Sequence, residues 1–261
     1  MVKNFKMNIK KHINNIQNNG ISIIPNLITQ KDCKSFKKKS IQLINNYKKL
    51  KKPLSAHNQV INSPFRYNKD FYKLIYNKKI DKILKKLIDK DYVLLNSNIL
   101  NRSIDKELNL NKKTLGDTWH TDTPAVGGKK KLNGFRFLVI IMLDNFTESN
   151  GCTYYIPKSH LNKKTPIRNK NYKCKKLLGK SGDVAIFDSS LWHKGGSAAY
   201  KNRLSLFSLY GPWWIKPYFN YEKMIGIKKL KKLKPNLRKI LHYNSTPPRC
   251  IEDRQNTVTD Y

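Results

Sequence analysis

The sequence is poor in acidic residues and contains no long apolar run. Asp and Glu number 17 against 53 Lys and Arg, which leaves a formal net charge of +36. The longest uninterrupted apolar stretch, Phe137–Leu143, is far too short to span a bilayer. The first fifteen residues are partly basic, but no apolar segment follows them. We therefore expect a soluble, unsecreted protein without membrane contact.

Cysteine is also scarce, with only four in 261 residues. These four show no paired metal-ligand spacing and are widely scattered: Cys33, Cys152, Cys174 and Cys250. The pattern therefore predicts neither a zinc module nor a disulfide framework. A reducing, cytoplasmic setting is the expectation that follows.

The positive charge has two interpretations. Dense Lys and Arg provide sequence-independent affinity for phosphates, as in nucleic-acid-binding proteins. The chain is equally rich in Asn and Ile, however, and Lys, Asn and Ile together are typical of A/T-rich coding sequences. The Lys runs 37–39, 129–131 and 228–234 also lack the interleaved aromatic residues of a base-stacking groove. We interpret the charge mainly as a solvated surface, which disfavours a nucleic-acid partner and leaves an anionic small molecule as a candidate ligand.

The order of sequence patterns predicts one domain over residues 1–261, with helices before and after a strand-rich core. Residues 1–90 indicate helices from Thr29 to Tyr47 and from Phe71 to Ile88, with one early strand after Gly20. The tail, residues 213–261, is again helical and basic, with a break at Pro235.

The core, residues 91–212, contains short β-rich runs that are separated by glycine turns. These runs are Tyr92–Leu95, Phe135–Leu143, Cys152–Ile156, Val184–Phe187 and Arg203–Tyr210. Many short strands of this kind predict a double-stranded β-helix, or jelly roll. The expected fold class is therefore mainly β with flanking helices, an α+β arrangement.

The tripeptide His120-Thr121-Asp122 is the first candidate for chemistry. On an extended strand, side chains two residues apart share a face, so His120 and Asp122 can bind one metal ion together. His193 follows the strand that ends at Asp188 and can provide a third ligand. Two imidazoles and one carboxylate, with other positions open, form the ligand set of a non-haem Fe(II) oxygenase rather than of a structural zinc site.

Four ordered segments resemble the phytanoyl-CoA dioxygenase family. They are Trp119-His120-Thr121-Asp122, Asn150-Gly151 leading to Pro157-Lys158-Ser159-His160, Gly182-Asp183-Val184 leading to His193-Lys194-Gly195-Gly196, and Arg203. Lys158 stands where glycine is usual in that family. The opening Asn19-Gly20-Ile21, which a helix follows, is similar as well, so that the resemblance covers most of the chain.

The resemblance implies an Fe(II)- and 2-oxoglutarate-dependent dioxygenase with His120, Asp122 and His193 as metal ligands. Arg203 would bind the distal carboxylate of 2-oxoglutarate, because a planar guanidinium forms paired charge-assisted hydrogen bonds. Such enzymes use O2, release succinate and CO2, and hydroxylate a small-molecule metabolite; ascorbate is an expected stimulant. In related halogenases a small residue replaces the carboxylate ligand, so Asp122 favours hydroxylation over halogenation.

Weaker candidates surround these residues. Thr153 and Asn98 are expected to contact 2-oxoglutarate, although packing alone also explains a β-branched residue in a strand, and Asn is common here. Asn96 is a similar candidate for 2-oxoglutarate or substrate. A loop over residues 123–133 is expected above the site, with Lys129–Lys131 as contacts for an anionic substrate.

Two alternatives remain open. One is a basic jelly-roll protein that binds a metal or nucleic acid without turnover. The other is a nucleic-acid demethylase, but that group usually carries a second Arg six residues after the co-substrate Arg, and position 209 is Leu. The oligomeric state and the substrate do not follow from the sequence.

Overall fold

The computed structural model describes residues 7–49, 58–102, 118–123, 125–126, 130–131, 134–196 and 201–243. Its α-helices are α1 (Ile9–Asn19), α2 (Gln30–Lys49), α3 (Tyr72–Ile75), α4 (Lys78–Leu87), α5 (Tyr221–Ile225), α6 (Ile227–Lys231) and α7 (Pro235–Ile240), with 3-10 turns η1 (Pro64–Arg66), η2 (Lys69–Phe71) and η5 (Ser159–Leu161). Its strands are β1 (Ile21–Ile24), β2 (Asn58–Asn62), β3 (Val93–Arg102), β4 (Ala125–Val126), β5 (Lys130–Lys131), β6 (Phe137–Met142), β7 (Thr153–Tyr155), β8 (Lys175–Lys176), β9 (Val184–Asp188), β10 (His193–Gly195) and β11 (Arg203–Gly211).

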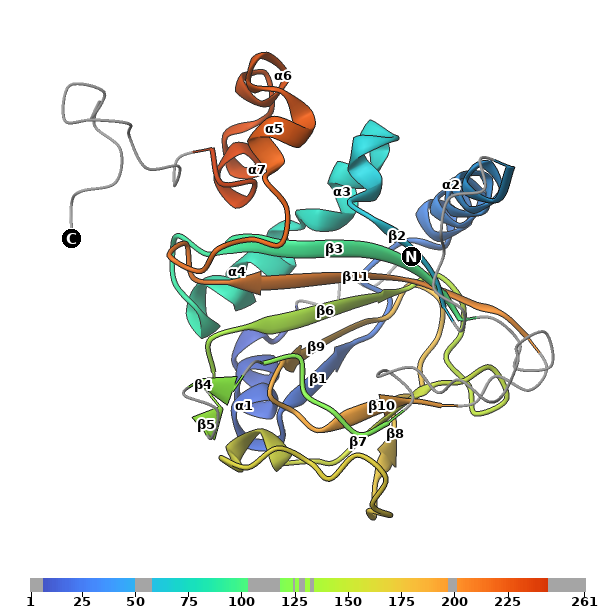
Figure 1. Cartoon of the computed structure of the whole chain (residues 1–261), viewed down its shortest axis with the longest axis vertical. Coiled ribbons are helices and arrows are strands. Elements are labelled where there is room, and N and C mark those ends of the chain that lie inside the picture. The colour runs from blue at the N-terminus through green and yellow to red at the C-terminus, as the bar shows by residue number, and fades with distance from the viewer. Residues whose placement is uncertain are drawn as a thin grey trace.

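Two antiparallel sheets face each other and form a jelly-roll core (Figure 1). The larger sheet has the strand order β1-β9-β6-β11-β3-β2, and the smaller one has the order β10-β7-β8. β4 and β5 form a separate short hairpin. Every paired strand in both sheets is antiparallel, and neither sheet closes on itself. The expected fold class is therefore confirmed.

Strand β6 lies in the middle of the large sheet and is buried on both faces. Phe137, Val139 and Ile141 point into the core shared with the helices. The alternate residues of β6, beginning with Leu138 and Ile140, point between the two sheets. This double burial explains why β6 is a continuous apolar run in place of the alternation of a half-exposed strand.

Helices cover the outer face of the large sheet. In Figure 1, α5, α6 and α7 lie over the β3 side of that sheet, whereas α1 lies next to β1. Leu230 and Ile240 of the C-terminal helices are buried in the same core as Ile16 of α1. Each helix thus buries an apolar face against the sheet, which is the main source of its stability.

The N-terminal third differs from the expected pattern. β2, which was not expected, forms an edge strand of the large sheet, and α1 precedes β1. The expected helix from Phe71 to Ile88 is broken, because Asn77 is extended and its side chain accepts the backbone N–H groups of Lys79 and Ile80. An N-cap of this kind begins a new helix, α4, that the three-and-four apolar spacing alone did not separate.

Within residues 213–243, the part of the tail that the structure describes, the expected helical character takes the form of the short helices α5, α6 and α7, and Pro235 occupies the first turn of α7. A further break lies at Gly226, which has a positive φ of 85° between α5 and α6. Of the cysteines, Cys33, Cys152 and Cys174 are free. Among the described residues, none of the helices combines the length and the apolar character that crossing a membrane requires.

Gly20 joins α1 to β1 in a left-handed conformation with φ of 83°, and its N–H donates to Ile16 O at 2.8 Å. A Cβ at this position would lie 2.5 Å from Leu191 Cδ1 and 2.7 Å from His160 Nδ1. At Gly134, which also has positive φ, a Cβ would have no neighbour within 4 Å among the described residues. Gly20 therefore meets both a backbone and a packing constraint, whereas Gly134 meets only the first.

We expect Gly134→Ala to lower the free energy of unfolding by about 1 kcal/mol, the usual cost of a left-handed non-glycine residue. Gly20→Ala adds overpacking, so we expect a total loss of roughly 2–4 kcal/mol. Urea denaturation of the two variants measures the difference. Equal losses at the two positions would show that a Cβ at position 20 fits beside Leu191 and His160 without overpacking.

Candidate metal centre

Three side chains converge at the edge of the jelly roll where β10 begins. His120, Asp122 and His193 each offer one ligand atom, and these atoms lie within 4.8 Å of one another. His193 Nε2 is 3.4 Å from Asp122 Oδ2, and His120 Nε2 is 3.9 Å from Asp122 Oδ1. Within the part of the chain that the structure describes, no other His, Cys, Asp or Glu cluster has this geometry. The three candidate ligands thus meet as one constellation.

Backbone hydrogen bonds, rather than a long strand, hold the segment of His120. His120 N donates to His193 O, and His193 N donates to His120 O, both at 3.0 Å. Asp122 N and Thr123 N both donate to Ser189 O, at 2.8 and 3.1 Å. The expected extended strand through His120 and Asp122 is wrong, because His120 forms only an isolated bridge. The bridge and the Ser189 carbonyl bring the two side chains together without it.

The tautomers of both histidines follow from their neighbours. His120 Nδ1 lies 2.8 Å from the carbonyl oxygen of Thr118, and His193 Nδ1 lies 2.8 Å from that of Leu191. A carbonyl oxygen only accepts, so each Nδ1 carries a proton and donates it. In the neutral ring, Nε2 then keeps its lone pair and faces the centre of the constellation. Metal-binding histidines are oriented in this way by their outer hydrogen bonds.

The carboxylate and the buried imidazole stabilise each other's charge. Burial opposes charge on His193, which is buried, but the nearby Asp122 carboxylate outweighs it and raises the pKa of His193. Burial also opposes charge on Asp122, yet His193, His120 and Arg136 together lower its pKa. Asp122 is therefore a carboxylate at neutral pH, ready to bind a cation.

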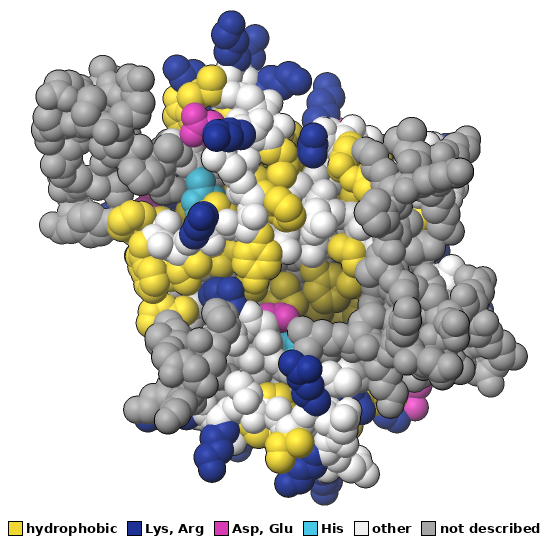
Figure 2. Space-filling model, in the orientation of Figure 1, with side chains coloured by type: hydrophobic (Ala, Val, Ile, Leu, Met, Phe, Trp, Pro, Cys, Tyr) yellow, Lys and Arg dark blue, Asp and Glu magenta, His cyan; other side chains and the backbone are white. Residues whose placement is uncertain are grey.

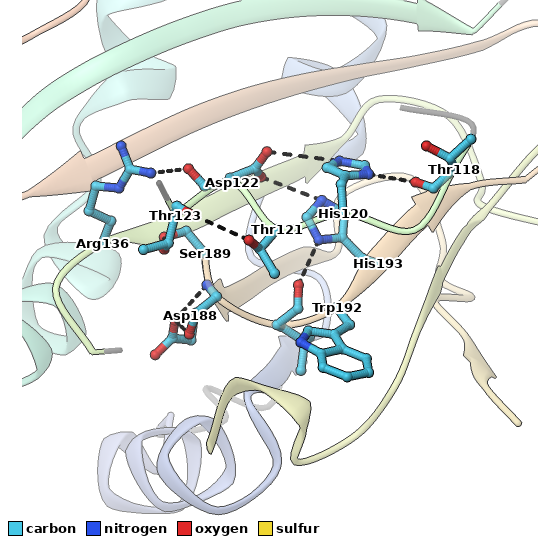
Figure 3. A network of polar contacts seen from close by, with 12 residues as sticks. Thr118, His120, Thr121, Asp122, Thr123, Arg136, Asp188, Ser189, Trp192 and His193 are labelled. Carbon is cyan, nitrogen blue, oxygen red and sulfur yellow. Dashed lines mark hydrogen bonds and ion pairs between the residues drawn. The ribbon is translucent and has the colours of Figure 1, made fainter. Parts of the chain in front are cut away.

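Arg136 holds Asp122 from the side away from the histidines (Figure 3). Its Nη2 donates to the backbone carbonyl oxygen of Asp122, and the side chain itself is buried. Arg136 lies just before β6, so the central strand of the large sheet positions the carboxylate residue. Thr123 adds a second support, since its Oγ1 lies 2.6 Å from Ser189 Oγ.

A cavity of about 240 Å3 opens beside the three candidate ligands. Its lining includes polar and charged side chains as well as apolar ones: Asn96, Asn98, Leu100, Arg102, His120, Asp122, Leu138, Thr153, Phe187, His193, Gly195, Arg203, Phe207, Leu209 and Tyr218. Figure 2 shows a hollow with hydrophobic side chains on its wall and acidic and histidine side chains at its edge. On the coloured part of this face, Lys and Arg side chains are scattered rather than gathered in one patch.

Arg203, Asn98 and Thr153, the three residues that the sequence analysis assigned to 2-oxoglutarate, all line this cavity. The two faces of β11 have different surroundings. Arg203, Phe207 and Leu209 face the cavity, whereas Leu204 and Leu206 lie in the core shared with the helices. Arg203 is 2% exposed, and its guanidinium carbon lies 3.9 Å from the centroid of the Phe146 ring. Its Nε and Nη1 have no hydrogen-bond partner among the described residues.

Two arginines near the site had escaped the sequence analysis. Arg102 ends β3 directly opposite Arg203, and Arg136 supports Asp122. For Arg102 the sequence does contain a signal, because Asn96, Asn98 and Arg102 share one face of an alternating strand. For Arg136 it contains none, since the contact is with a backbone carbonyl.

Other residues near the candidate ligands make structural contacts. His160 Nε2 lies 2.9 Å from the carbonyl oxygen of Gln17, and His160 is not among the three residues that could bind one ion. Trp119 and Trp192, which precede the two histidines, both pack edge-on against Tyr172. The β4–β5 hairpin occupies part of the expected 123–133 loop, but the side chains of Lys129–Lys131 lie outside the described residues.

Comparison with known proteins gives a consistent family assignment. The family model described as phytanoyl-CoA dioxygenase (PhyH) matches residues 16–199. The dioxygenase af480 of Aspergillus fumigatus is 30% identical over 128 residues, which cover 47% of this chain and 41% of that protein. The match with this relative thus spans less than half of either chain.

Solved structures with the same fold are more distant in sequence. HygX from Streptomyces hygroscopicus, with nickel and 2-oxoglutarate bound, has a TM-score of 0.63 at 14% identity, covering 80% of this chain and 89% of that one. SnoK, a non-haem α-ketoglutarate-dependent carbocyclase from nogalamycin biosynthesis, has a TM-score of 0.61 at 15% identity, covering 87% and 91%. At these identities the likeness shows the fold.

The raised pKa of His193 predicts pH-dependent metal binding. A metal must displace the proton on Nε2, so the apparent affinity for Co(II) should rise with pH and level off only above the raised pKa of His193. Without metal, folding stability changes with pH in the opposite direction to metal affinity. It falls as pH rises, because the stabilising contribution of protonated His193 is lost as pH rises through that pKa. Co(II) titrations between about pH 5 and 8 by visible absorption measure the first effect. A flat profile over that range would contradict it.

The Arg136 contact predicts a loss of metal affinity without loss of a ligand. Arg136→Met should weaken Co(II) binding by about 10- to 100-fold, the usual effect of removing a group that orients a metal ligand. Arg66→Met, at an exposed position in η1, removes the same charge and should leave the affinity within two-fold. Equal losses in both variants would show a general charge effect instead.

Proposed function

The chain belongs to the phytanoyl-CoA dioxygenase family, and we propose that it is an Fe(II)- and 2-oxoglutarate-dependent dioxygenase that hydroxylates a small-molecule metabolite. The observation that carries this proposal is the convergence of His120, Asp122 and His193 beside a cavity that also contains Arg203. A metal site next to a buried cationic anchor is the arrangement that a chelating dicarboxylate requires.

The residues present fit Fe(II). Two imidazole Nε2 atoms and one carboxylate face a common centre, and both histidines donate their Nδ1 protons to backbone carbonyls. Two nitrogen ligands and one oxygen ligand on one side of a metal leave the other positions for exchangeable ligands. A closed structural zinc site would need a fourth protein ligand, and the described residues provide only these three.

The residues also fit 2-oxoglutarate as the co-substrate. Arg203 is buried, and its Nε and Nη1 have no hydrogen-bond partner among the described residues. A buried guanidinium in that condition costs stability unless a ligand provides the missing acceptors, and a carboxylate is the group that matches its fork. Thr153 and Asn98 line the same cavity and are proposed to contact this co-substrate. HygX, which has the same fold, has been solved with nickel and 2-oxoglutarate bound.

When bound, Fe(II) with 2-oxoglutarate and O2 supplies the oxidant for a C–H bond, with release of succinate and CO2. The protein's own residues hold and orient the reactants. Arg203 would bind the distal carboxylate, and the Thr118 and Leu191 carbonyls accept the Nδ1 protons, so that in the neutral rings both Nε2 lone pairs would face the metal. Leu138 and Phe187 contribute apolar side chains to the lining of the cavity.

The substrate is proposed to enter where the cavity meets the surface. Tyr218 lines the cavity and is 55% exposed, and its N–H donates to Leu95 O at 3.0 Å. Asn96 and Leu209 lie at the same end, as register partners on β3 and β11. One amide and two largely apolar side chains suit a small organic molecule. HygX has also been solved with hygromycin B bound, which shows that this fold accommodates a small-molecule ligand.

Anaerobic addition of Fe(II) and 2-oxoglutarate to the purified protein tests the proposal. We expect a weak visible charge-transfer absorption that requires both additions, because the keto acid must chelate the metal. His120→Ala should abolish it. As a control, His242→Gln should retain the absorption, since His242 hydrogen-bonds to the Leu94 carbonyl and is not one of the three candidate ligands.

Turnover separates an enzyme from a protein that only binds. Release of succinate under O2, screened across a panel of metabolites, should identify at least one compound that stimulates it. Absorption without any succinate release would favour a metal-binding protein without turnover, and no absorption in the unmodified protein would contradict the proposal.

A further inference from the structure

One row of residues crosses the large sheet on its cavity face and leads from the open end of the cavity to the metal site. The row consists of register partners on β3, β11, β6 and β9, namely Asn96, Leu209, Leu138 and Phe187. All four side chains line the cavity. The ring centroid of Phe187 lies 5.2 Å from that of His193, so the row ends beside a candidate metal ligand.

Asn96 is the polar member of this row. Its side chain is half-buried, and its Oδ1 is buried without a hydrogen-bond partner among the described residues. A buried acceptor in that condition costs free energy, which a bound donor recovers. 2-Oxoglutarate offers only acceptors, two carboxylates and a keto oxygen, so it cannot provide the donor. The primary substrate, which is proposed to enter at this end of the cavity, can provide it.

The charged side chains in the described lining of the cavity lie away from Asn96. Asp122 belongs to the metal site, and Arg102 and Arg203 are register partners at the far end of β3 and β11. Along β11, Arg203 is six residues from Leu209, which is roughly 20 Å at a rise of about 3.4 Å per residue. The row through Asn96 thus offers a bound molecule apolar contacts and one amide, but no group that would neutralise a charge.

We infer that Asn96 selects the primary substrate, and that this substrate is an uncharged molecule with an apolar body and a hydroxyl group that pairs with the Asn96 amide. The inference rests on the proposed function and names the chemical class of its substrate. A hydroxyl both donates and accepts, so it pairs with the amide oxygen, or with the amide nitrogen when a half-turn of the side chain exchanges the two. Leu209 and Leu138 contact the apolar body. Asn98 lies one row nearer to Arg203, where the co-substrate is proposed to bind.

The spacing of the strands limits the size of such a molecule. Neighbouring strands lie about 4.8 Å apart, so three spacings separate the backbones of Asn96 and Phe187 by roughly 14 Å. The side chains at both ends shorten this length, which leaves room for a body of about two fused rings. A hydroxyl that is held at Asn96 points the opposite edge of such a body toward His193. The recognised hydroxyl and the reacting carbon therefore lie at opposite ends of the substrate.

The fluorescence of three matched naphthalene probes tests this assignment without turnover. 2-Naphthol, naphthalene and 2-naphthoate share one ring system and carry a hydroxyl, no polar group and an anion, respectively. Protein that is loaded with Ni(II) and saturated with 2-oxoglutarate is titrated into each probe, and Ni(II) quenches the emission of a ring bound in the cavity. The unmodified protein should bind 2-naphthol at least about 3-fold more tightly than naphthalene and about 10-fold more tightly than 2-naphthoate.

Asn96→Leu keeps nearly the shape of the side chain and removes the amide. The ratio of 2-naphthol affinity to naphthalene affinity should fall by about 3- to 10-fold, the range for one neutral hydrogen bond. Asn96→Ser shortens the polar group and should lower the same ratio; it carries the test if Asn96→Leu does not fold, as judged by circular dichroism. Asn45→Leu, at an exposed position of α2, is the matched control and should leave all three affinities unchanged.

Four results overturn the inference. In the first, both Asn96 variants leave the affinity ratio unchanged. In the second, the unmodified protein binds 2-naphthoate as tightly as 2-naphthol, so the site does not select an uncharged molecule. In the third, protein that binds Ni(II) and 2-oxoglutarate binds no 2-naphthol. These three leave the proposed function standing, whereas the fourth, a protein that binds Ni(II) but not 2-oxoglutarate, overturns that function as well.

Discussion

The reciprocal backbone pairing of His120 with His193 is the contact on which the candidate site depends. The two residues come from segments that are far apart in the chain, and two hydrogen bonds of 3.0 Å place their rings next to each other. The ring centroids are 4.3 Å apart, so both Nε2 atoms can reach one ion. Asp122 then follows from the same segment, because the Ser189 carbonyl fixes its backbone. Without this bridge the three ligand atoms would have no common centre.

Residues at the ends of two strands of the large sheet hold the segment that contains Asp122. β9 ends at Asp188, whose Oδ1 accepts a hydrogen bond from Ser190 N and whose Oδ2 accepts one from Gly134 N. The next residue, Ser189, carries the carbonyl oxygen that accepts from Asp122 N. Arg136 reaches the same carboxylate residue from the start of β6. The central strands, buried on both faces, therefore extend directly into the groups that orient the candidate metal ligands. Rigid supports of this kind are what a site of defined geometry needs.

Charge is distributed unevenly between the surface and the cavity. The chain carries a net charge of +36, yet the coloured part of the face around the hollow shows no single basic patch. The positive groups that bear on the proposed chemistry are the buried Arg136 and Arg203. Burial makes each of them far more effective than an exposed lysine, because the low dielectric of the interior strengthens its interaction with an anion or a carbonyl.

The sequence was sufficient for much of the secondary structure and for the three residues that converge. Features that neighbouring residues form by themselves can be predicted from the sequence. The apolar run of β6 is one such feature, and the N-cap at Thr29, whose Oγ1 accepts a hydrogen bond from Asp32 N at 3.1 Å, is another. The break at Asn77 shows the limit of this kind of prediction, since apolar spacing continues across it while a cap begins a new helix.

The tertiary structure decided everything that depends on contacts between distant segments. It assigned the cavity face of β11, replaced the expected strand at His120 by an isolated bridge, and placed Arg102 opposite Arg203. It also brought Arg136 to a backbone carbonyl, an acceptor that every residue possesses and that no sequence pattern distinguishes. The chain alone therefore determined which residue types were available for the chemistry. Strand pairing determined which of them meet, because register joins residues whose separation in sequence carries no local signal.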